Sequence, residues 1–431
     1  MPRKTKDLIR SDQLRGAKYL GRVLPLLRKL HDDGTARDKA GNRELFYDQY
    51  AALVLLSMFS PALDSLRAIR QATALPKARK LLGCSHCSLG SLSEAARVFD
   101  PGLLTQVVAE LGGELAPELA PLAKDPRLKD VRHTLVLVDG TLLKALPRLV
   151  ESAWKTSRTG TPMHGWRMHT QFDLGLGAPS DVELTDYRNS GASDEREVLK
   201  ANLRPGRCYV MDRGYFAYWL FDAVVAAGSD YVCRVKKSLA FEVTEERAVT
   251  AAAKEAGVVR DAVVRAGDGR TKGPRGVRTT SHPVRLVWVE VQVAPRAARG
   301  TAKPQGPPRT EVLILATNLL DVPAEVVALV YKYRWTVELF FRFFKQVLGC
   351  RHLISDDPRG VAIQCYCAVI ACMLLALWTG RKPDKATWRM VHWLLTGWAD
   401  EQDLLAHLSQ PDNRGVKLRA KDELWKKLGV H

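Results

Sequence analysis

A chain of 431 residues that is 46% hydrophobic is long enough to bury a large core, which excludes a disordered protein and a small disulfide-stapled scaffold. Its 65 lysines and arginines exceed its 47 aspartates and glutamates, and the resulting net charge of +18 indicates a polyanionic partner, either nucleic acid or an anionic membrane surface. The eight cysteines are too sparse for a disulfide framework and the charged first residues do not resemble a secretory signal, so we expect a cytoplasmic protein.

The N-terminal quarter of the chain has a helical pattern. Apolar residues recur at helical spacing from Leu45 to about Leu111, and Ser91 and Glu94 stand at the spacing of a capping box. A segment rich in proline and charge, 115–132, is predicted to be a linker. We therefore predict a helical domain over residues 1–125.

After this linker the pattern of apolar residues changes from helical spacing to short continuous runs, which are typical of buried strands. The run 134–138 is apolar and ends at Asp139-Gly140, which predicts a strand that finishes at a turn. Further strands are predicted at 168–176, 181–185, 208–211 and 231–235, with helices at 194–201 and 216–228. Strands mixed with helices indicate an α/β or α+β core whose first part covers residues 126–235.

Residues 236–310 interrupt this rhythm and predict a β-rich insertion. Its middle alternates apolar and polar residues, and both of its ends are rich in glycine, proline and arginine. Between Val264 and Thr310 there are ten lysines and arginines against two acidic residues, a net charge of +8. If DNA is the partner, such clustering marks the side of the protein that faces the phosphates, although a solvated surface insertion has the same composition.

The second part of the core is predicted over residues 311–380. A strand at 312–317 precedes one long helix from Ala324 to Leu348. The segment Val361–Thr379 has nineteen residues without a charge, which is long enough to cross a bilayer, but its Gln364 and three cysteines favour a helix buried inside the protein. Residues 381–431 are predicted to form a helical C-terminal region.

The long helix carries polar residues on one face. At about 100° per residue, Tyr331, Arg334, Glu338 and Lys345 fall within an arc of about 60°, while the apolar residues lie opposite. This face presents a carboxylate between two cations and a phenol. An ordinary amphipathic surface helix also separates polar from apolar residues, so this pattern alone leaves both interpretations open.

Two aspartates follow predicted strands. Asp139 and Asp212 each precede a turn with glycine, so both are expected at the carboxyl edge of the sheet, where ligands of open α/β sheets bind. With Glu338 they would form an oxygen-only site suited to Mg²⁺, and two such ions about 4 Å apart can activate a hydroxyl and stabilise the leaving oxygen of a phosphodiester. Either aspartate alone is more often a helix cap or turn residue, and it is the combination that points to a site.

These motifs carry a resemblance to a known family. Asp139 in LVLVDGT, Asp212 in VMDRGYF and the Tyr331, Arg334, Glu338 and Lys345 spacing in YKYRWTVELFFRFFK resemble the DDE transposases of bacterial insertion sequences. Within that family the pattern is similar to the insertion-sequence-four group with its Tyr-Arg-Glu-Lys signature. The resemblance covers about residues 130–380.

The resemblance implies an RNase H-like catalytic core, interrupted by the β-rich insertion, between an N-terminal helical domain and a helical C-terminal tail. It implies an enzyme that cleaves transposon ends and joins the freed 3′-hydroxyls to target DNA, with Mg²⁺, or Mn²⁺ in its place, held by Asp139, Asp212 and Glu338. The partners would be double-stranded DNA, namely the terminal inverted repeats and the target, and the protein would bind this DNA as a homodimer. No membrane would be involved. Tyr331, Arg334, Lys345 and Arg213 would contact phosphates.

Some members of this family have a tryptophan just before the last core strand that stacks on a flipped base during hairpin formation. The corresponding position here is near Val312, and Trp288 in the insertion is the candidate to replace the tryptophan.

Two alternatives to a transposase remain: a Mg²⁺-dependent nuclease or resolvase that does not join strands, and a DNA-binding protein derived from a transposase that no longer cuts.

Overall fold

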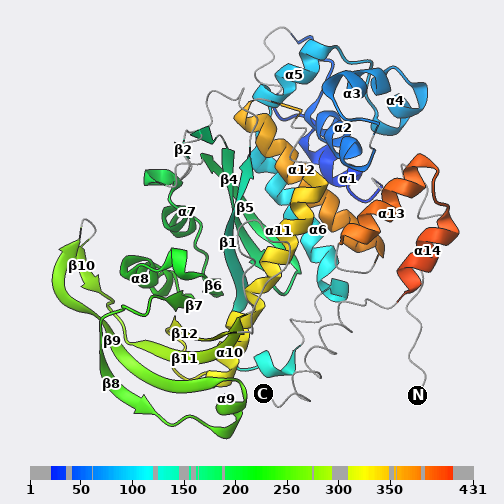
Figure 1. Cartoon of the computed structure of the whole chain (residues 1–431). Helices are drawn as coiled ribbons and strands as arrows, with labels where there is room; N and C mark the ends of the chain where they lie inside the picture. Colours follow the sequence, from blue (N-terminus) through cyan, green and yellow to red (C-terminus); the bar gives the residue numbers. More distant parts are fainter. Residues whose placement is uncertain are drawn as a thin grey trace.

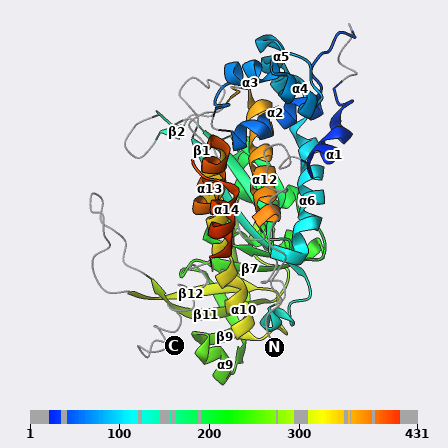
Figure 2. The ribbon, with the colours of Figure 1, turned by 90° about the vertical axis from the view of Figure 1, so that its right-hand side faces the viewer.

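The computed structural model describes residues 21–34, 41–60, 62–119, 125–144, 155–156, 162–163, 165–186, 190–273, 276–293, 309–348, 354–355, 357–379 and 384–410. The protein is a mixed α/β structure built around one large sheet (Figure 1). Figure 2 shows the N-terminal helices α2–α5 at one end of the molecule and the β-rich region with β9 and α9 at the other.

Five strands form one end of the sheet, in the order β5-β4-β1-β6-β7. β1 pairs in parallel with β6, and β6 in parallel with β7, whereas β4 and β5 run antiparallel on the other side of β1. The bounds of these strands are Thr134–Lys144 (β1), Gly165–Asp173 (β4), Ala178–Asp186 (β5), Arg207–Met211 (β6) and Asp230–Val235 (β7). The predicted strands are therefore present.

The predicted insertion is rich in β-structure, and its strands extend the sheet beyond the predicted core strand at 312–317. β7 pairs with β12 (Arg309–Thr317), which pairs with β11 (Val284–Val293). The sheet then continues through β9, with β8 and β10 beside it, and a short helix α9 lies between β8 and β9; their bounds are Phe241–Arg247 (β8), Ala251–Glu255 (α9), Val258–Gly273 (β9) and Gly276–Thr279 (β10). A small two-stranded sheet pairs Lys155–Thr156 (β2) with Pro162–Met163 (β3).

A buried ion pair within the insertion also bonds to the core. Asp261 on β9 and Arg285 on β11 pair at 2.7 Å, and both side chains are 4% exposed. Arg285 also donates to the backbone carbonyls of Leu319 and Val322, in the segment before α10. The ion pair therefore fixes the two insertion strands to the chain that leads into the next helix.

Alternation along β1 separates two hydrophobic clusters on opposite faces of the sheet. Leu135 and Leu137 pack in a cluster with α10, α11 and α12, while Val136 and Val138 pack in one with α7 and α8. These helices are Ala324–Tyr333 (α10), Trp335–Leu348 (α11), Pro358–Thr379 (α12), Glu195–Ala201 (α7) and Tyr218–Ala226 (α8). Asp139 continues the alternation toward α11, and Gly140 toward α7.

The helix α12 is the centre of the helical part. Residues 360–376 are all buried, and α12 packs against α2 (Tyr47–Phe59), α5 (Leu89–Val98) and α6 (Leu104–Leu119). By length and composition alone α12 could cross a membrane, yet its most apolar stretch is entirely covered by protein. The sequence predicted a helix buried inside the protein, and that is where α12 lies.

The remaining helices are short. They comprise Leu24–Leu27 (α1), Leu66–Thr73 (α3), Pro76–Leu82 (α4), Lys385–Thr396 (α13), Glu401–Ser409 (α14) and the 3₁₀ turns Arg28–Leu30, Pro101–Leu103, Pro126–Leu128, Gly191–Ser193 and Arg213–Tyr215. The predicted linker 115–132 begins too early, because α6 continues through Pro117 to Leu119. The packing of α6 against α12 and β5 outweighs the weak helix propensity of its two glycines and its proline.

Candidate active site

Asp139 lies within a strand, not at the end of one. The sequence predicted that the strand ends there, but β1 continues to Lys144 because Asp139 and the following residues pair with β4, as in Asp139 with Thr170. The parallel partner β6 ends earlier. The last β1–β6 pair is Leu137 with Val210, so Asp139 and Asp212, each two residues further on, lie side by side where the parallel part of the sheet ends.

Asp139 is largely covered by neighbouring groups. Its side chain is 20% exposed, and its Oδ1 accepts a hydrogen bond of 2.8 Å from the backbone N–H of Gly140. Burial raises the pKa of Asp139 to about 6, the cation of Arg334 opposes that rise, and the negative charges of Asp212 and Glu338 add to it. Asp212 and Glu338 are therefore both close enough to act electrostatically on Asp139.

Asp212 caps the 3₁₀ turn that follows β6. Its Oδ1 accepts a hydrogen bond of 2.7 Å from the backbone N–H of Gly214. A Cβ atom on Gly214 would lie 3.0 Å from that same oxygen, so a larger residue would displace the carboxylate. The Asp-Arg-Gly sequence thus fixes the direction of the Asp212 side chain.

The long helix predicted from Ala324 to Leu348 is two helices. α10 ends at Tyr333 and α11 begins at Trp335, because the backbone tightens around Arg334. The N–H of Arg334 bonds to the carbonyl of Tyr331 at 3.1 Å, and the N–H of Val337 to that of Arg334 at 3.3 Å, each three residues apart instead of four.

Arg334 joins two of the three acidic residues. Its Nη2 donates to Oε1 of Glu338 at 2.7 Å, and its Nη1 lies 3.6 Å from Oδ2 of Asp139. Arg334 is 14% exposed and Glu338 30% exposed, so the glutamate is partly open to solvent and is not turned into the hydrophobic interior. Figure 1 shows α11, which carries Glu338, beside β1.

The other predicted phosphate-contacting residues differ in exposure. Tyr331 is half-buried on α10 with the Arg334 guanidinium 5.9 Å from its ring centre, and burial raises its pKa. Arg213 is exposed directly beside Asp212. Lys345 is exposed on α11, about two helical turns beyond Glu338. Tyr331 and Arg213 are thus near the acidic residues, whereas Lys345 lies further along α11, the helix that carries Glu338.

Trp288 is not brought to this site. It lies on β11, four strands from β1 in the sheet order, or about 19 Å at the usual strand spacing. The Arg260 guanidinium lies 4.6 Å from its ring centre and Phe241 contacts it edge-on at 5.9 Å. Val312 pairs with Glu290 on the neighbouring strand. The role predicted for Trp288 in base stacking stays a prediction.

Three residues near the acidic edge were not found from the sequence. Arg167 on β4 forms an ion pair with Glu195 on α7, and both side chains are mostly buried. Trp335, next to Arg334, is 53% exposed, which is unusual for so large an apolar side chain. In the sequence, Glu195 is marked only as a glutamate that follows a helix-capping aspartate, so no pattern points to it. Trp335 lies within the signature segment and could have been found there.

The acidic residues have the ligand chemistry that suits a hard divalent cation, although they do not form a complete coordination site. Among the residues that the structure describes, no three acidic, histidine or cysteine side chains lie close enough to be a preformed metal site. Carboxylate oxygens are the ligands that Mg²⁺ prefers, and it retains several waters. The Arg334 guanidinium between Asp139 and Glu338 shows that this position already favours a positive charge.

Carboxylates that meet from a strand, a strand end and a helix are of the kind that hold paired divalent ions in phosphatases, polymerases and nucleases. The family model for the transposase DDE domain matches residues 131–374, which is more than half of the chain. The protein therefore belongs to the DDE transposase family.

Individual relatives agree with this assignment. The putative transposase y4zB of Sinorhizobium fredii is 28% identical over 273 residues, which are 63% of this chain and 67% of that protein. The probable transposase for insertion sequence element IS5377 of Geobacillus stearothermophilus is 29% identical over 219 residues, half of each chain.

The solved piggyBac transposase synaptic complex with hairpin DNA is 11% identical, covering 95% of this chain and 85% of that one, with a TM-score of 0.39. A TM-score this low does not establish a shared fold.

Proposed function

We propose that this protein cleaves DNA at transposon ends and joins the freed 3′-hydroxyls to target DNA, as expected for the insertion-sequence-four group. The observation that carries the proposal is the contact of Arg334 with both Asp139 and Glu338, beside Asp212. Residues almost 200 positions apart in the chain thus meet at one sheet edge. A purely structural role would not require acidic residues to approach one another there, since like charges repel.

In this proposal Asp139, Asp212 and Glu338 hold Mg²⁺, or Mn²⁺ in its place. When bound, these ions would supply an activated hydroxyl and charge stabilisation at the cleaved phosphodiester. Arg334 would turn its planar guanidinium from the two carboxylates to a DNA phosphate, beside the Tyr331 ring whose centre lies 5.9 Å from it. Arg213 and Lys345 would bind phosphates as exposed cations.

The strand order supports an RNase H-like core. Three parallel strands, β1, β6 and β7, are flanked at β1 by the antiparallel pair β4 and β5, and the acidic residues come from β1, the end of β6 and a helix on one face. We also propose that the protein is cytoplasmic, needs no membrane, and binds double-stranded DNA as a homodimer through residues 1–125 and the insertion.

The proposed function is tested with purified protein, Mg²⁺ and a DNA that carries the inverted repeats flanking the gene. The expected products are cut repeat ends and ends covalently joined to a target plasmid. Cleavage without any joined product would favour the nuclease alternative. Binding without cleavage, in either metal, would favour the non-cutting DNA-binding protein.

The basic loops of the insertion are expected to contribute to DNA affinity. Shortening the segments between Gly267 and Arg309, of which 294–308 lie outside the described residues, should weaken binding and flatten its salt dependence, since fewer counterions would be released. The slope of log affinity against log salt concentration measures this effect. An unchanged slope would mean that the insertion is only a solvated surface.

The exposed Trp335 is expected to stack on a DNA base beside the acidic residues. Replacing Trp335 with alanine should weaken binding of DNA with unpaired ends by about 1–3 kcal/mol, the usual contribution of one stacked base. Fluorescence anisotropy with labelled ends measures this loss. Trp398, which is 86% exposed near the end of α13, provides a matched alanine control that should bind normally.

A further inference from the structure

A second arginine–carboxylate pair lies on the other face of the sheet from Arg334. Glu195, the first residue of α7, pairs with Arg167 of β4, and their side chains are 17% and 14% exposed. Burying a glutamate and an arginine is costly, and such a pair is often no more stabilising than apolar residues of the same volume. Its neighbours are the two glycines that follow the catalytic aspartates.

The distances around these glycines place Glu195 at the acidic edge. A Cβ atom built on Gly140 would lie 3.6 Å from both Cδ of Glu195 and Nη1 of Arg167. A Cβ atom on Gly214 would lie 3.0 Å from Oδ1 of Asp212 and 3.8 Å from Oε2 of Glu195. The oxygens of Asp212 and Glu195 are therefore no more than 6.8 Å apart, the sum of those two distances.

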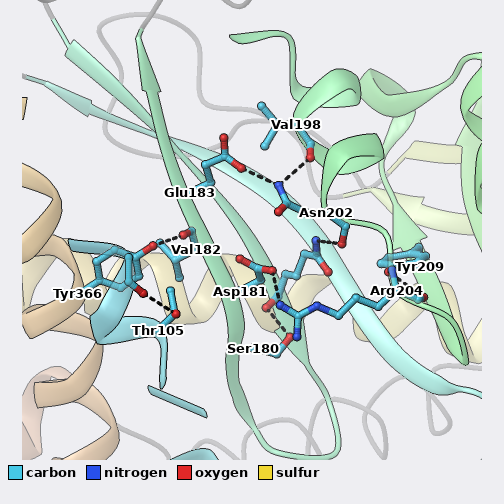
Figure 3. A network of polar contacts seen from close by, with 12 residues as sticks. Thr105, Ser180, Asp181, Val182, Glu183, Val198, Asn202, Arg204, Tyr209 and Tyr366 are labelled. Carbon is cyan, nitrogen blue, oxygen red and sulfur yellow. Dashed lines mark hydrogen bonds and ion pairs between the residues drawn. The ribbon is translucent and has the colours of Figure 1, made fainter. Parts of the chain in front are cut away.

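The helix that carries Glu195 is firmly attached to the sheet. Asn202, at the end of α7, donates to Oε2 of Glu183 on β5 at 2.6 Å and accepts a hydrogen bond of 3.1 Å from Gln171 on β4 (Figure 3). Arg204, just beyond, pairs with Asp181 of β5 at 2.9 Å. These contacts attach the C-terminal end of α7 to the sheet, and the ion pair of Glu195 with Arg167 attaches its first residue.

A small cavity beside Glu195 contains polar atoms with no partner. It is lined by Glu195, Tyr215, His169 and Thr170, and its volume of about 20 Å³ holds one water molecule. Tyr215 is 1% exposed, and its hydroxyl has no hydrogen-bond partner among the described residues; the same holds for Nδ1 of His169 and Oγ1 of Thr170. Buried polar atoms without partners indicate a missing water or ligand at this position.

We propose that Glu195 is a fourth carboxylate of the divalent-cation site, acting on the Asp212 side through water, and that Arg167 neutralises it when no cation is bound. Arg167 and Arg334 then have matching roles: each is mostly buried, and each balances acidic charge on one face of the sheet. Mg²⁺ keeps several of its waters, so a carboxylate a few ångströms beyond direct contact still holds the hydrated ion. This inference rests on the proposed function.

The experiment is a titration of the full-length protein with Mn²⁺, in which electron paramagnetic resonance measures the free ion. The variant Glu195→Gln should bind Mn²⁺ about 10-fold to 100-fold more weakly, the usual effect of losing an outer carboxylate. Arg167→Gln should bind it more tightly, because Glu195 is then no longer neutralised. Glu197→Gln, two residues along α7, is the matched control and should bind like the wild type.

Mn²⁺ affinity is thus expected to fall in Glu195→Gln and to rise in Arg167→Gln. If the ion pair were only structural, loss of either residue would weaken Mn²⁺ binding. If Glu195→Gln unfolds, the double variant Arg167→Gln with Glu195→Gln leaves no unpaired buried charge and should still bind Mn²⁺ weakly. The proposal for Glu195 is overturned if Asp212→Asn weakens binding but Glu195→Gln does not, and the proposed function then stands. If the wild type itself binds no Mn²⁺, both fail.

Discussion

Single replacement of Asp139, Asp212 or Glu338 by alanine is expected to reduce Mg²⁺-dependent strand cleavage by about a thousandfold or more. Each variant removes one ligand of an ion that supplies several kcal/mol of transition-state stabilisation, and every 1.4 kcal/mol is about tenfold in rate. Cleavage of a labelled repeat end in a gel assay measures the rate. DNA binding should stay largely intact, because most affinity comes from phosphate contacts elsewhere.

The control for these variants is Glu255→Ala, which removes an exposed acidic residue from α9 in the insertion. It should cleave at the wild-type rate. Normal cleavage by any one of the three site variants would remove that residue from the proposed metal ligands, and the structure offers Glu195 as the carboxylate to examine next.

The largest expected effect on stability comes from the buried ion pair between Asp261 and Arg285. Replacing Asp261 with alanine leaves Arg285 charged and 4% exposed without its carboxylate, which typically costs about 3–5 kcal/mol. The free energy of unfolding in urea should fall by this amount. Because Arg285 also bonds to Leu319 and Val322, we expect the loosened segment to include the start of α10.

A double variant tests the reason for this loss. Asp261→Leu with Arg285→Met removes both charges and keeps an apolar volume, so it should be much more stable than Asp261→Ala and close to the wild type. Equal losses in the single and double variants would show that the strands β9 and β11 depend on the shape of the pair and not on its charge.

Much of the fold follows from local patterns in the sequence. The apolar runs of β1, β6 and β7 and the buried character of α12 are visible because these elements are covered on all sides and contain few polar residues. The end of β1 was predicted wrongly, since pairing with β4 continues past the glycine after Asp139, and cross-strand pairing is not a local property.

The candidate site was predicted in part for similar reasons. The spacing of Arg334 and Glu338 is helical and so readable from sequence, and their ion pair is present. The break at Arg334 was not predicted, because no proline or glycine marks it. Glu195 could not have been found, since only tertiary packing brings α7 to the backbone beside Asp139 and Asp212.

The packing of α12 against α2 has a consequence for how the chain is made. The Phe59 ring of α2 lies 5.3 Å from that of Trp378 in α12, and the two helices are separated by about 300 residues of sequence. At about 5–20 residues per second, a ribosome takes roughly 15–60 s to synthesise that interval. During this time the apolar surface that α12 covers in the folded protein lacks that helix, so a newly made chain is most prone to aggregate before its last quarter emerges.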